Sequence, residues 1–538
     1  MKIIGLDFGT TNSTISYFDT ESQALVSFKS KAKDNDYIPT IVSYNNKNHD
    51  ISIGNAAKQN LTSKSHEAYE NFKLLLGKNF DDVIEGKTKT PIQVTHDFIK
   101  CFLEEYKKSQ RIEKIDGIVM TVPETWFREA SNRTARENIE GIFRKLGYSE
   151  FEFQLESEPV AAAAYFCKAH ELNKEMNPKG KKYTGFITVI DYGGGTLDVT
   201  LCEANDGKIR ILERCGFGEY NDTNGCAGVA FDEAVIEKLV RDKGLSISKG
   251  SPKFIKLRNS FEDRKIEDDN ITKNLKYYYV DPAIVEGEPL FSLEYDDDVE
   301  MDVHCKDLDK CFSEVNAPKL TESLEQIKQF FHVHKVDSSA QENFRVLLVG
   351  GFSNFYSVEK EVREFFGSTT ESIDKRFEQP FAILNRALSI SRGAALIAQD
   401  PDGVIHTCTH SYGYIVHELG KNDQLVDKYV QVIEKGTDIK TLGKPVYAKK
   451  PVQVRHKAGK LRIFMDDGRP NHAGRLPLSL DESVKELFPN LSDSDNEYRI
   501  GFSVSINQIP TIHIIDKRRN LNATSLNKLF EKISIMEK

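Results

Sequence analysis

An aspartate inside an apolar run is the first residue of this sequence that could do chemistry. It is Asp7, in the stretch "IIGLDFGTTNST" (residues 3–14), where a glycine and two threonines follow the apolar residues. A strand of this composition is expected to be buried, and a buried carboxylate is costly unless it meets a cation or hydrogen-bond donors. Asp7 therefore needs a partner that its own strand does not supply.

The same pattern occurs a second time, in "IDYGGGTLDVT" (residues 190–200). Laid over the first stretch without a gap, it places Asp191 over Asp7, Gly193 over Gly9, Gly195 over Thr11 and Asp198 over Thr14. Each copy is typical of a strand that ends in an acid and a tight glycine turn. An internal repeat of this kind predicts two related lobes, each of which directs a hairpin at one shared cleft.

The residue types in the two turns favour phosphate binding. Glycines in such turns permit positive φ and let backbone amides approach an anion closely, and the hydroxyls of Thr10, Thr11 and Thr196 add donors. Acids beside phosphates repel them unless a cation is present. Asp7 and Asp191 therefore predict Mg²⁺, held through its water molecules because Mg²⁺ gives up water reluctantly. Either copy alone is equally consistent with an ordinary hairpin turn, but the matched pair favours a nucleotide site.

A third strand that ends in glycine occurs in "LLVGGFSN" (residues 347–354), with Gly350 and Gly351 before a helix. Backbone exposed there would admit a flat base and a ribose. The order of the three glycine turns then predicts two phosphate contacts followed by a nucleoside contact. The usual alternative, a Walker A loop, is excluded because the sole "GKT", at 86–88, has Asp81 where the first glycine belongs.

The elements that must position these residues are those of an α/β domain. Up to about residue 400, short β-branched runs alternate with helical patterns, which predicts a mainly parallel or mixed sheet. The run "IDGIVMTVP" (residues 115–123) predicts a buried strand, followed by a helix around residues 128–147.

The pattern changes at Pro401. Proline, aspartate and glycine at 400–403 cannot easily continue a helix, so residues 401–407 are expected to be a linker. Strand-like runs such as "YRIGFSVSI" predict a small all-β, sandwich-like domain over 408–522. The apolar residues of "SLNKLFEKISIM" recur at helical spacing, which predicts a C-terminal helix over 523–538.

Composition excludes several classes of partner. The chain has 538 residues, which predicts two or more globular domains, and its formal net charge of −9 argues against a nonspecific nucleic-acid binder. No stretch suits a membrane span or a secretory signal, so a cytoplasmic protein with no membrane partner is expected. The eight cysteines lack CxxC pairing and suit free thiols. A zinc site is the alternative for five residues whose spacing fits no standard finger: His304, Cys305, Cys311, His332 and His334.

The ordered set of motifs resembles the actin, hexokinase and heat-shock ATPase superfamily. Its finer residues are similar to the heat-shock protein 70 family of DnaK-like chaperones, in the motifs "IIGLDFGTTNS", "FKLLLGK", "TVPETW", "SEPVAAAAYF", "VIDYGGGTLDVT" and "LLVGGFSN". The likeness implies a two-lobed, actin-like nucleotide-binding domain over 1–400 with duplicated ribonuclease H-like lobes. Lobe I would take 1–185 plus 375–400, and lobe II would take 186–374. Two later stretches, "YVQVIEKGTDIK" and "IGFSVSINQIPTIHIIDK", are similar to strands of the family's β substrate-binding domain.

The resemblance also implies roles for matched residues. Lys73 matches the family's catalytic lysine, which holds the γ-phosphate and the attacking water, and Glu158 matches an acid that contacts the water around the metal. Asp7 and Asp191 would hold the hydrated Mg²⁺, while Thr196 and Asp198 would lie near the γ-phosphate and the nucleophilic water. The other nucleotide contacts implied are Gly9, Thr10, Thr11, Asn12, Gly193, Gly194, Gly195, Gly228, Glu262, Lys265, Gly350 and Gly351. Slow hydrolysis of ATP to ADP would then rest on positioning and electrostatic stabilisation.

The sequence departs from the family pattern at several places. Asn354 stands where an arginine is expected after the "VGG" turn, and Ile266 stands where the family has its base-stacking arginine. The linker keeps only Val404 and Ile405 of the usual acidic, leucine-rich run, and the chain ends where the family's helical lid begins. Weaker adenine contacts, faster client exchange and weaker coupling between the domains are therefore expected.

The function favoured by these motifs is an ATP-hydrolysing, chaperone-like protein whose β domain binds unfolded or extended polypeptide under nucleotide control. A co-chaperone or nucleotide-exchange factor would be a further partner. Two alternatives remain. One is a small-molecule kinase of the same superfamily, which would need an acid placed to deprotonate a substrate hydroxyl. The other is an actin-like filament or nucleotide-switched scaffold, which would use the same cleft as an assembly switch.

Overall fold

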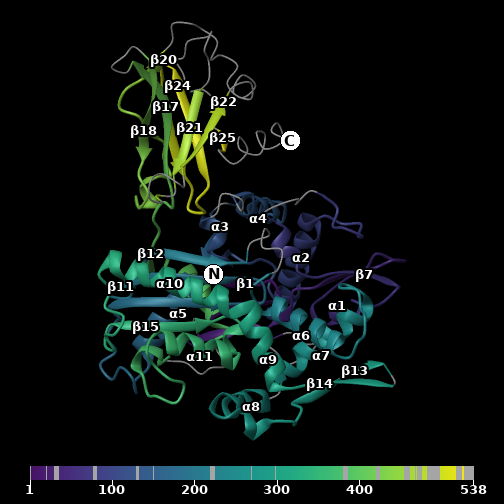
Figure 1. Ribbon diagram of the computed structural model, residues 1–538. Coiled ribbons are helices and arrows are strands. Elements are labelled where there is room, and N and C mark those ends of the chain that lie inside the picture. The colour runs from purple at the N-terminus through teal and green to yellow at the C-terminus, as the bar shows by residue number, and fades with distance from the viewer. Residues whose placement is uncertain are drawn as a thin grey trace. The chain divides into compact units, whose positions relative to one another are not determined.

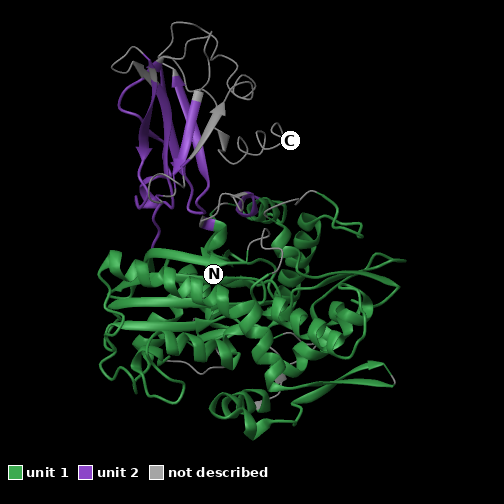
Figure 2. Cartoon of the chain, viewed as in Figure 1, with its two compact units in different colours: residues 1–126, 138–404 green, residues 127–137, 405–538 purple. Residues whose placement is uncertain are grey.

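The computed structural model places the chain in two compact units. Unit 1 holds residues 1–126 and 138–404, and unit 2 holds residues 127–137 and 405–538 (Figure 2). The division after residue 404 lies inside the stretch expected to be a linker. The described residues are 2–19, 21–22, 24–29, 36–76, 82–128, 133–149, 151–218, 225–267, 269–296, 298–379, 386–419, 424–453, 461–466, 468, 475–480, 497–516 and 524–525.

Lobe I of unit 1 is built on a mixed sheet. Its strands are β1 (Ile3–Phe8), β2 (Asn12–Asp19), β3 (Ala24–Ser27), β4 (Ile38–Pro39), β8 (Gly117–Val122) and β9 (Phe153–Ser157). Their order is β3-β2-β1-β8-β9, with β4 paired to β2. Asp7 on β1 lies opposite Thr14 in the antiparallel β1–β2 pair and opposite Thr121 in the parallel β1–β8 pair.

Lobe II repeats this topology. Its strands are β10 (Gly185–Tyr192), β11 (Leu197–Asn205), β12 (Lys208–Phe217), β15 (Phe344–Val349) and β16 (Val404–Ile405), in the order β15-β10-β11-β12-β16. Asp191 lies opposite Asp198 in the antiparallel β10–β11 pair and opposite Val349 in the parallel β10–β15 pair. Because Asp191 and Asp198 occupy the places of Asp7 and Thr14, the register confirms the duplication predicted from the sequence repeat.

Helices cover the two sheets and separate them (Figure 1). They are α1 (Gly54–Gln59), α2 (Pro91–Gln110), α3 (Thr125–Arg128), α4 (Arg133–Lys145), α5 (Glu158–Leu172), α6 (Gly228–Asp242), α7 (Pro252–Glu267), α8 (Asp269–Val280), α9 (Cys305–Cys311), α10 (Ala317–His334), α11 (Tyr356–Phe365) and α12 (Ser389–Gln399). Helix α12 packs on β1, β2 and β8, whereas α5 packs on β10, β11 and β15, and the two helices pack on each other. Their approach is close, since a Cβ added at Gly393 would lie 1.7 Å from the Ala161 carbonyl oxygen.

Local sequence explains how several of these elements begin. Helix α2 starts with a capping box between Thr90 and Gln93, with Pro91 in its first turn. Strand β1 is covered on both faces, which suits its continuous apolar run, and Phe8 packs against Phe98 of α2 at 5.9 Å between ring centroids. The helix expected around 128–147 is α4, which begins at Arg133.

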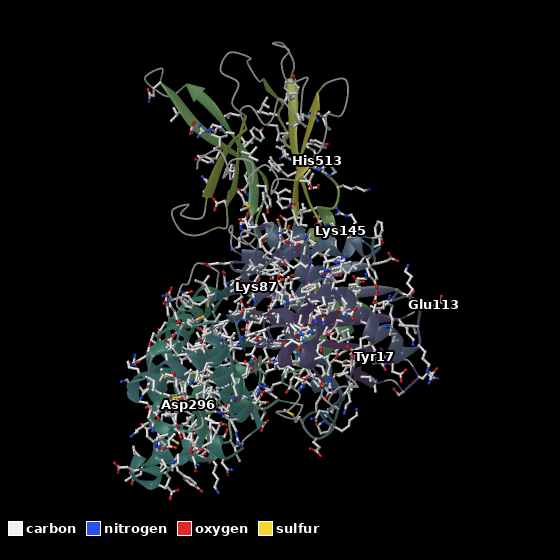
Figure 3. All side chains as sticks on the ribbon, turned by 90° about the vertical axis from the view of Figure 1, so that its right-hand side faces the viewer. Tyr17, Lys87, Glu113, Lys145, Asp296 and His513 are labelled. Carbon is white, nitrogen blue, oxygen red and sulfur yellow. The ribbon has the colours of Figure 1, made fainter. Side chains whose placement is uncertain are left out.

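Smaller elements complete unit 1. Lobe I carries a sheet of β5 (Val42–Asn45), β6 (Ile51–Ile53) and β7 (His66–Tyr69), followed by a 3₁₀ turn, η1 (Phe72–Leu75). Lobe II carries a hairpin of β13 (Phe291–Asp296) and β14 (Val299–Val303). Charged side chains such as Glu113 of lobe I and Asp296 of this hairpin lie on the outside (Figure 3). Within the residues that the structure describes, no helix combines the length and apolar character needed to cross a membrane.

The eight cysteines are free thiols. Cys305 and Cys311 begin and end α9 and are buried. In the described part of the chain, no set of three His, Cys, Asp or Glu side chains is arranged to hold a metal ion directly. The residues considered for a zinc site therefore belong to the core and surface of lobe II.

Unit 2 is built mainly of two antiparallel sheets. The first has β17 (Ser411–Leu419), β18 (Leu425–Ile433), β21 (Leu461–Asp466) and β22 (Arg475–Leu480); the second has β19 (Val446–Tyr447), β20 (Val452–Gln453), β23 (Glu497–Val504), β24 (Pro510–Asp516) and β25 (Thr524–Ser525). Buried side chains of both sheets form one core, in which the rings of Tyr412 and Phe502 stack. Of the helix expected over 523–538, Thr524 and Ser525 form β25, and residues 526–538 lie outside the described residues.

Candidate functional site

The tips of the β1–β2 and β10–β11 hairpins meet between the two lobes. A Cβ added at Gly195 would lie 2.6 Å from Thr10 Oγ1, and one added at Gly194 would lie 2.7 Å from Thr11 Oγ1. None of the turn glycines, Gly9 and Gly193 to Gly195, has a positive φ. The expectation of positive φ at these turns is therefore wrong. Side chains at Gly194 and Gly195 would collide with the opposite hairpin, and one at Gly9 would collide with the Asn12 carbonyl oxygen of the same turn, whereas a Cβ at Gly193 would meet only the Thr196 carbonyl oxygen, at 3.9 Å.

Behind the hairpin tips lie Asp7 and Asp191, the matched aspartates of the sequence repeat. Asp7 is 8% exposed and Asp191 is 4% exposed. Burial and the charge of Glu158 raise the pKa of Asp7 to about 7, although Lys73 acts in the opposite direction. Burial and the neighbouring carboxylates also raise the pKa of Asp191 well above its ordinary value. Burial and mutual repulsion therefore disfavour the ionised form of both acids, and a cation bound beside them would offset that cost.

Asp198 belongs to the same group of acids. It is fully buried, and its Oδ1 accepts a hydrogen bond of 3.3 Å from the Thr125 backbone amide. Burial and the charge of Glu158 raise the pKa of Asp198 to about 8. Asp198 lies opposite Asp191 in the β10–β11 pair, at the position that Thr14 takes in the first hairpin, so the second hairpin brings a further acid to the site.

Lys73 supplies positive charge to this group. It is 2% exposed, and its Nζ donates to the Phe8 carbonyl oxygen and, at 2.9 Å, to Glu158 Oε1. Lys73 comes from η1, whereas Glu158 is the first residue of α5. The sequence resemblance assigned Lys73 to the γ-phosphate and Glu158 to the water around the metal, and the fold brings the two residues into direct contact.

Gly350 keeps the end of β15 close to Asp191. It has φ +82°, and a Cβ there would lie 2.4 Å from Asp191 Oδ1. Only glycine adopts this conformation at little cost and leaves space for the carboxylate. Gly351 differs, because an added Cβ would meet no atom within 4 Å, so its surroundings are open.

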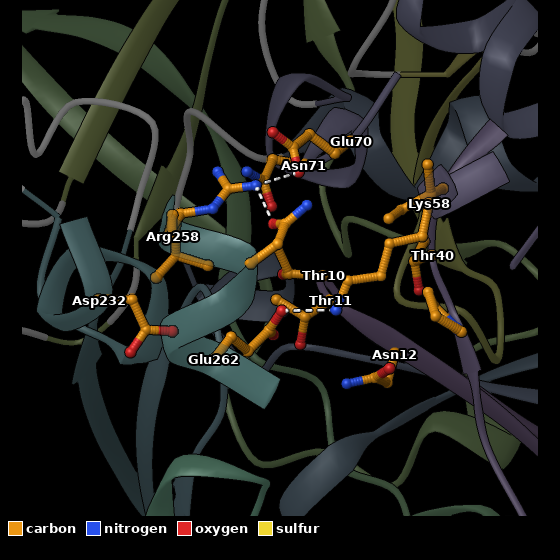
Figure 4. Close-up of a pocket in the computed structure, with 14 residues that line it drawn as sticks. Thr10, Thr11, Asn12, Thr40, Lys58, Glu70, Asn71, Asp232, Arg258 and Glu262 are labelled. Carbon is orange, nitrogen blue, oxygen red and sulfur yellow. Dashed lines mark hydrogen bonds and ion pairs between the residues drawn. The ribbon is translucent and has the colours of Figure 1, made fainter. Parts of the chain in front are cut away.

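A pocket opens beside the hairpin tips, between the first hairpin and helix α7 (Figure 4). Its lining residues are Thr10, Thr11, Asn12, Pro39, Thr40, Ile41, Lys58, Glu70, Asn71, Val229, Asp232, Arg258, Asn259 and Glu262. Two ion pairs cross it: Lys58 Nζ to Glu262 Oε2 at 3.0 Å and Arg258 NH2 to Glu70 Oε2 at 2.6 Å. Each pair joins lobe I to α7 in lobe II, so the pairs link the two lobes at the pocket.

The remaining implied contacts have partners within the protein. Lys265 forms an ion pair with Asp232, and its Nζ lies 5.4 Å from the centre of the Phe352 ring. The Gly228 amide donates to the Gly193 carbonyl oxygen at 3.1 Å. Ile266 is 55% exposed. The side expected to hold base and ribose therefore presents an apolar side chain where the family has an arginine.

Some residues of the site were not anticipated from the sequence. Thr121 Oγ1 donates to Asp7 Oδ1 at 3.2 Å, and Lys58 and Arg258 close the pocket. Thr121 lies in the quoted "TVPETW" motif, next to Asp7 in the parallel β1–β8 pair, so the strand pairing was the signal that could have found it. Lys58 and Arg258 carry no local signal.

The acid group fits a divalent cation. The Oδ2 atoms of Asp191 and Asp198 are buried and, within the described residues, have no hydrogen-bond partner. Lys73 and Glu158 interact electrostatically with both Asp7 and Asp191, and Glu158 and Asp191 also interact with Asp198, so the acids outnumber the one lysine in this set. Oxygen ligands of this kind suit Mg²⁺, which is commonly held by one or two carboxylates and several water molecules.

A comparison with protein-family models decides the relationship of the chain. A family model described as Hsp70 protein matches residues 3–98 and 83–399. The chain belongs to the Hsp70 family. Unit 1 is accordingly the actin-like ATPase domain of an Hsp70 protein, followed by a β-rich region. At the level of the family, membership supports ATP binding, ATP hydrolysis and a chaperone-type function.

Proposed function

We propose that this Hsp70 protein is a slow, Mg²⁺-dependent ATPase whose β domain binds extended or unfolded polypeptide under nucleotide control. The observation that carries the proposal is the meeting of two matched hairpins in front of a buried group of acids. Thr10 and Thr11 of one hairpin face Gly195 and Gly194 of the other. This arrangement supplies hydroxyl and backbone donors from both lobes to one anionic ligand.

The residues of the site divide the work of phosphoryl transfer to water. Asp7 and Asp191 would hold Mg²⁺ through its water molecules, and the bound ion would offset charge on the phosphate oxygens. Lys73 has three N–H donors, of which Phe8 and Glu158 take two, so one remains for the γ-phosphate. The two hydrogen bonds fix the position of the Lys73 ammonium group in advance, so little reorganisation is needed at the moment of reaction.

Asp198 is suited to the attacking water. A carboxylate with a raised pKa is a stronger base once it is ionised, and the pKa of Asp198 is raised to about 8. Its Oδ1 is held by the Thr125 amide, so the side chain is oriented before water arrives. Thr196, the first residue after the glycine turn, also hydrogen-bonds to the Asp198 side chain through its hydroxyl.

The nucleoside would be held more loosely than the phosphates. Glu262 and Lys265, implied in ribose and base contacts, are engaged by Lys58 and Asp232 respectively. Burial alone would raise the pKa of Glu262, but Lys58 and Lys265 hold it below its ordinary value, so Glu262 is ionised at neutral pH. Exposed Ile266 offers apolar contact to a base.

Polypeptide binding is proposed for unit 2. Its sheets offer strand edges, and backbone hydrogen bonds at such an edge are one of the usual means of holding an extended peptide. A cytoplasmic location and a co-chaperone or nucleotide-exchange factor are part of the same proposal. Since binding free energies are reciprocal, any effect of ATP on client affinity must equal the effect of client on ATP affinity.

Single-turnover ATP hydrolysis tests the enzymatic part. Wild type and Lys73→Ala are compared with equilibrium nucleotide binding measured alongside. We expect Lys73→Ala to bind nucleotide but to hydrolyse it about 100- to 1000-fold more slowly, the usual effect of removing one electrostatic donor. Hydrolysis at the wild-type rate by Lys73→Ala would contradict the assigned role of the lysine.

Client binding tests the chaperone part. An unfolded model protein and a set of extended peptides are titrated against the full chain with ATP and with ADP. Failure to bind any of them in either state would remove polypeptide binding from the proposal while leaving the ATPase intact. ATP consumption that rises only when a sugar is supplied would favour a small-molecule kinase, and sedimentable polymer with ATP would favour a filament.

A further inference from the structure

Glu124 is a buried acid that lies near Glu158 and Asp198. None of the roles assigned above involves it. It follows β8 and is 2% exposed. One of its carboxylate oxygens pairs with Arg214 of β12, and the other accepts a hydrogen bond from the Ser157 hydroxyl at the end of β9. Strands β8 and β9 are parallel, with Val122 opposite Ser157, so Glu124 lies at the same sheet edge as Glu158.

Ser157 shows that this contact is made in place of a more usual one. It is the N-cap residue of α5, where a serine side chain ordinarily accepts a hydrogen bond from the first turn of the helix. Here the hydroxyl makes no capping bond and donates to Glu124. The next residue is Glu158, which binds Lys73. Glu124 therefore fixes the backbone position from which Glu158 extends.

The other side of Glu124 leads to Asp198. Residue 125, directly after Glu124, donates its amide to Asp198 Oδ1. On lobe II, Asp198 and Thr200 point to one face of β11, and Arg214 lies opposite Thr200 on the neighbouring strand. Arg214 and Asp198 thus share a sheet face. The Glu124–Arg214 pair ties this face of lobe II to the edge of lobe I that carries Glu158.

We propose that Glu124 and Arg214 are positioning residues of the catalytic centre. By joining β12 of lobe II to the ends of β8 and β9 of lobe I, they hold Glu158 and Asp198 in the mutual arrangement that hydrolysis needs. They set the rate of the chemical step and leave nucleotide affinity nearly unchanged. This inference rests on the proposed ATPase function.

Charge supports a functional reading of the pair. A buried ion pair is weak grounds for a stabilising role, because apolar side chains of similar volume often replace one without loss. Glu124 also adds negative charge beside acids that already repel one another, and its charge contributes to the raised pKa values of Asp198 and Glu156. The Glu124–Arg214 pair is therefore better explained by the positions it fixes than by a contribution to stability.

The test uses the full chain and compares single-turnover ATP hydrolysis, ATP dissociation constant and thermal unfolding. The variants are Arg214→Met, Arg214→Lys, Glu124→Gln, Ser157→Ala and the double variant Glu124→Gln with Arg214→Met. Arg210→Met is the matched control, because Arg210 lies on the same strand and pairs with Glu203 at 2.7 Å on the surface.

We expect Arg214→Met and Glu124→Gln to slow hydrolysis about 10- to 100-fold, the scale of a misplaced catalytic group, with little change in ATP affinity. The double variant should be no slower than either single variant, because residues that act as a unit are not additive. Arg214→Lys should recover part of the rate, and Arg210→Met should match wild type.

Three results would overturn the proposal. In the first, the folded single variants hydrolyse ATP at the wild-type rate. In the second, they lose ATP affinity in proportion to rate, as a general structural defect would cause. If neither charge variant folds, Ser157→Ala decides, because it leaves the ion pair in place, and an unchanged rate there would count against the proposal. Absence of hydrolysis in the wild-type chain would instead refute the ATPase function itself, and this inference with it.

Discussion

Asp198 makes the stability of the empty protein depend on pH. Its carboxyl has an ordinary value of 3.8 and, in the folded chain, a pKa of about 8 because of burial. Between these values the unfolded chain has released the proton while the folded chain keeps it. The stability that this group provides is therefore fully present below about pH 4 and is lost as the pH rises to about 8. Asparagine does not titrate, so Asp198→Asn removes this dependence of stability on pH.

The size of the effect follows from the proton difference. One proton more in the folded state lowers the free energy of unfolding by about 1.4 kcal/mol per pH unit as the pH rises. Over the two units from pH 5 to pH 7 this amounts to roughly 2–3 kcal/mol for Asp198 alone. Other acids also titrate, but they are common to both proteins. The difference between the wild-type and Asp198→Asn curves therefore reports Asp198 together with its effect on the pKa of Asp191, which acts in the same direction.

The chain carries its own probe for this measurement. Its single tryptophan, Trp126, is 6% exposed and directly follows the residue whose amide binds Asp198. Urea unfolding of metal-free and nucleotide-free protein is followed by tryptophan fluorescence at pH 5, 6, 7 and 8. Asp337→Asn is the control, because Asp337 is exposed and its Ser339 hydrogen bonds hold its pKa below the ordinary value.

We expect Asp198→Asn to gain roughly 2–3 kcal/mol relative to wild type between pH 5 and pH 7, while Asp337→Asn stays parallel to wild type. Parallel curves for Asp198→Asn and wild type would refute the reasoning. They would mean that Asp198 keeps its ordinary pKa in the folded chain, so that burial and the charge of Glu158 do not disfavour its ionised form.

Two further predictions concern the glycine turn and the ion pairs. Gly350→Ala should lower the free energy of unfolding by roughly 2 kcal/mol or more, because a side chain at φ +82° is strained and would strike Asp191, whereas Gly351→Ala should unfold like wild type; equal urea midpoints for the two variants would contradict this. Lys58→Gln should speed dissociation of a fluorescent nucleotide about 2- to 5-fold, since a partly exposed ion pair contributes roughly 0.4–1 kcal/mol. Lys114→Gln, which breaks the surface pair with Glu152, should leave that rate unchanged, and a rate for Lys58→Gln equal to wild type would show that the pair does not retain nucleotide.

Local patterns allowed much of the fold to be predicted. The repeat of Asp7 and its turn at Asp191 marks two hairpins, and the structure pairs Asp7 with Thr14 just as it pairs Asp191 with Asp198. The alternation of short strands beyond residue 407 likewise gave the two sheets of unit 2. These features depend on neighbours within a few residues, whose spacing fixes which side chains share a face.

Contacts between distant segments could not be predicted in this way. Lys58 and Glu262 are far apart in the chain, as are Glu124 and Arg214, and no local pattern marks either pair. The explanation that the sequence suggested for glycine in these turns was also wrong. Sequence suggests backbone freedom, but Gly194 and Gly195 are required by the opposite hairpin, and that close approach exists only after the lobes have folded together.

The most direct test of the central claim is the rate of single-turnover ATP hydrolysis as Mg²⁺ is titrated, for wild type and Asp7→Asn. The central claim is that Asp7 and Asp191 grip a metal-bound triphosphate from the two lobes. It predicts that wild-type hydrolysis stops when divalent cations are removed and saturates as Mg²⁺ is restored. It also predicts that folded Asp7→Asn needs a much higher Mg²⁺ concentration. Hydrolysis that persists without divalent cations, or an Asp7→Asn titration that coincides with wild type, would contradict it.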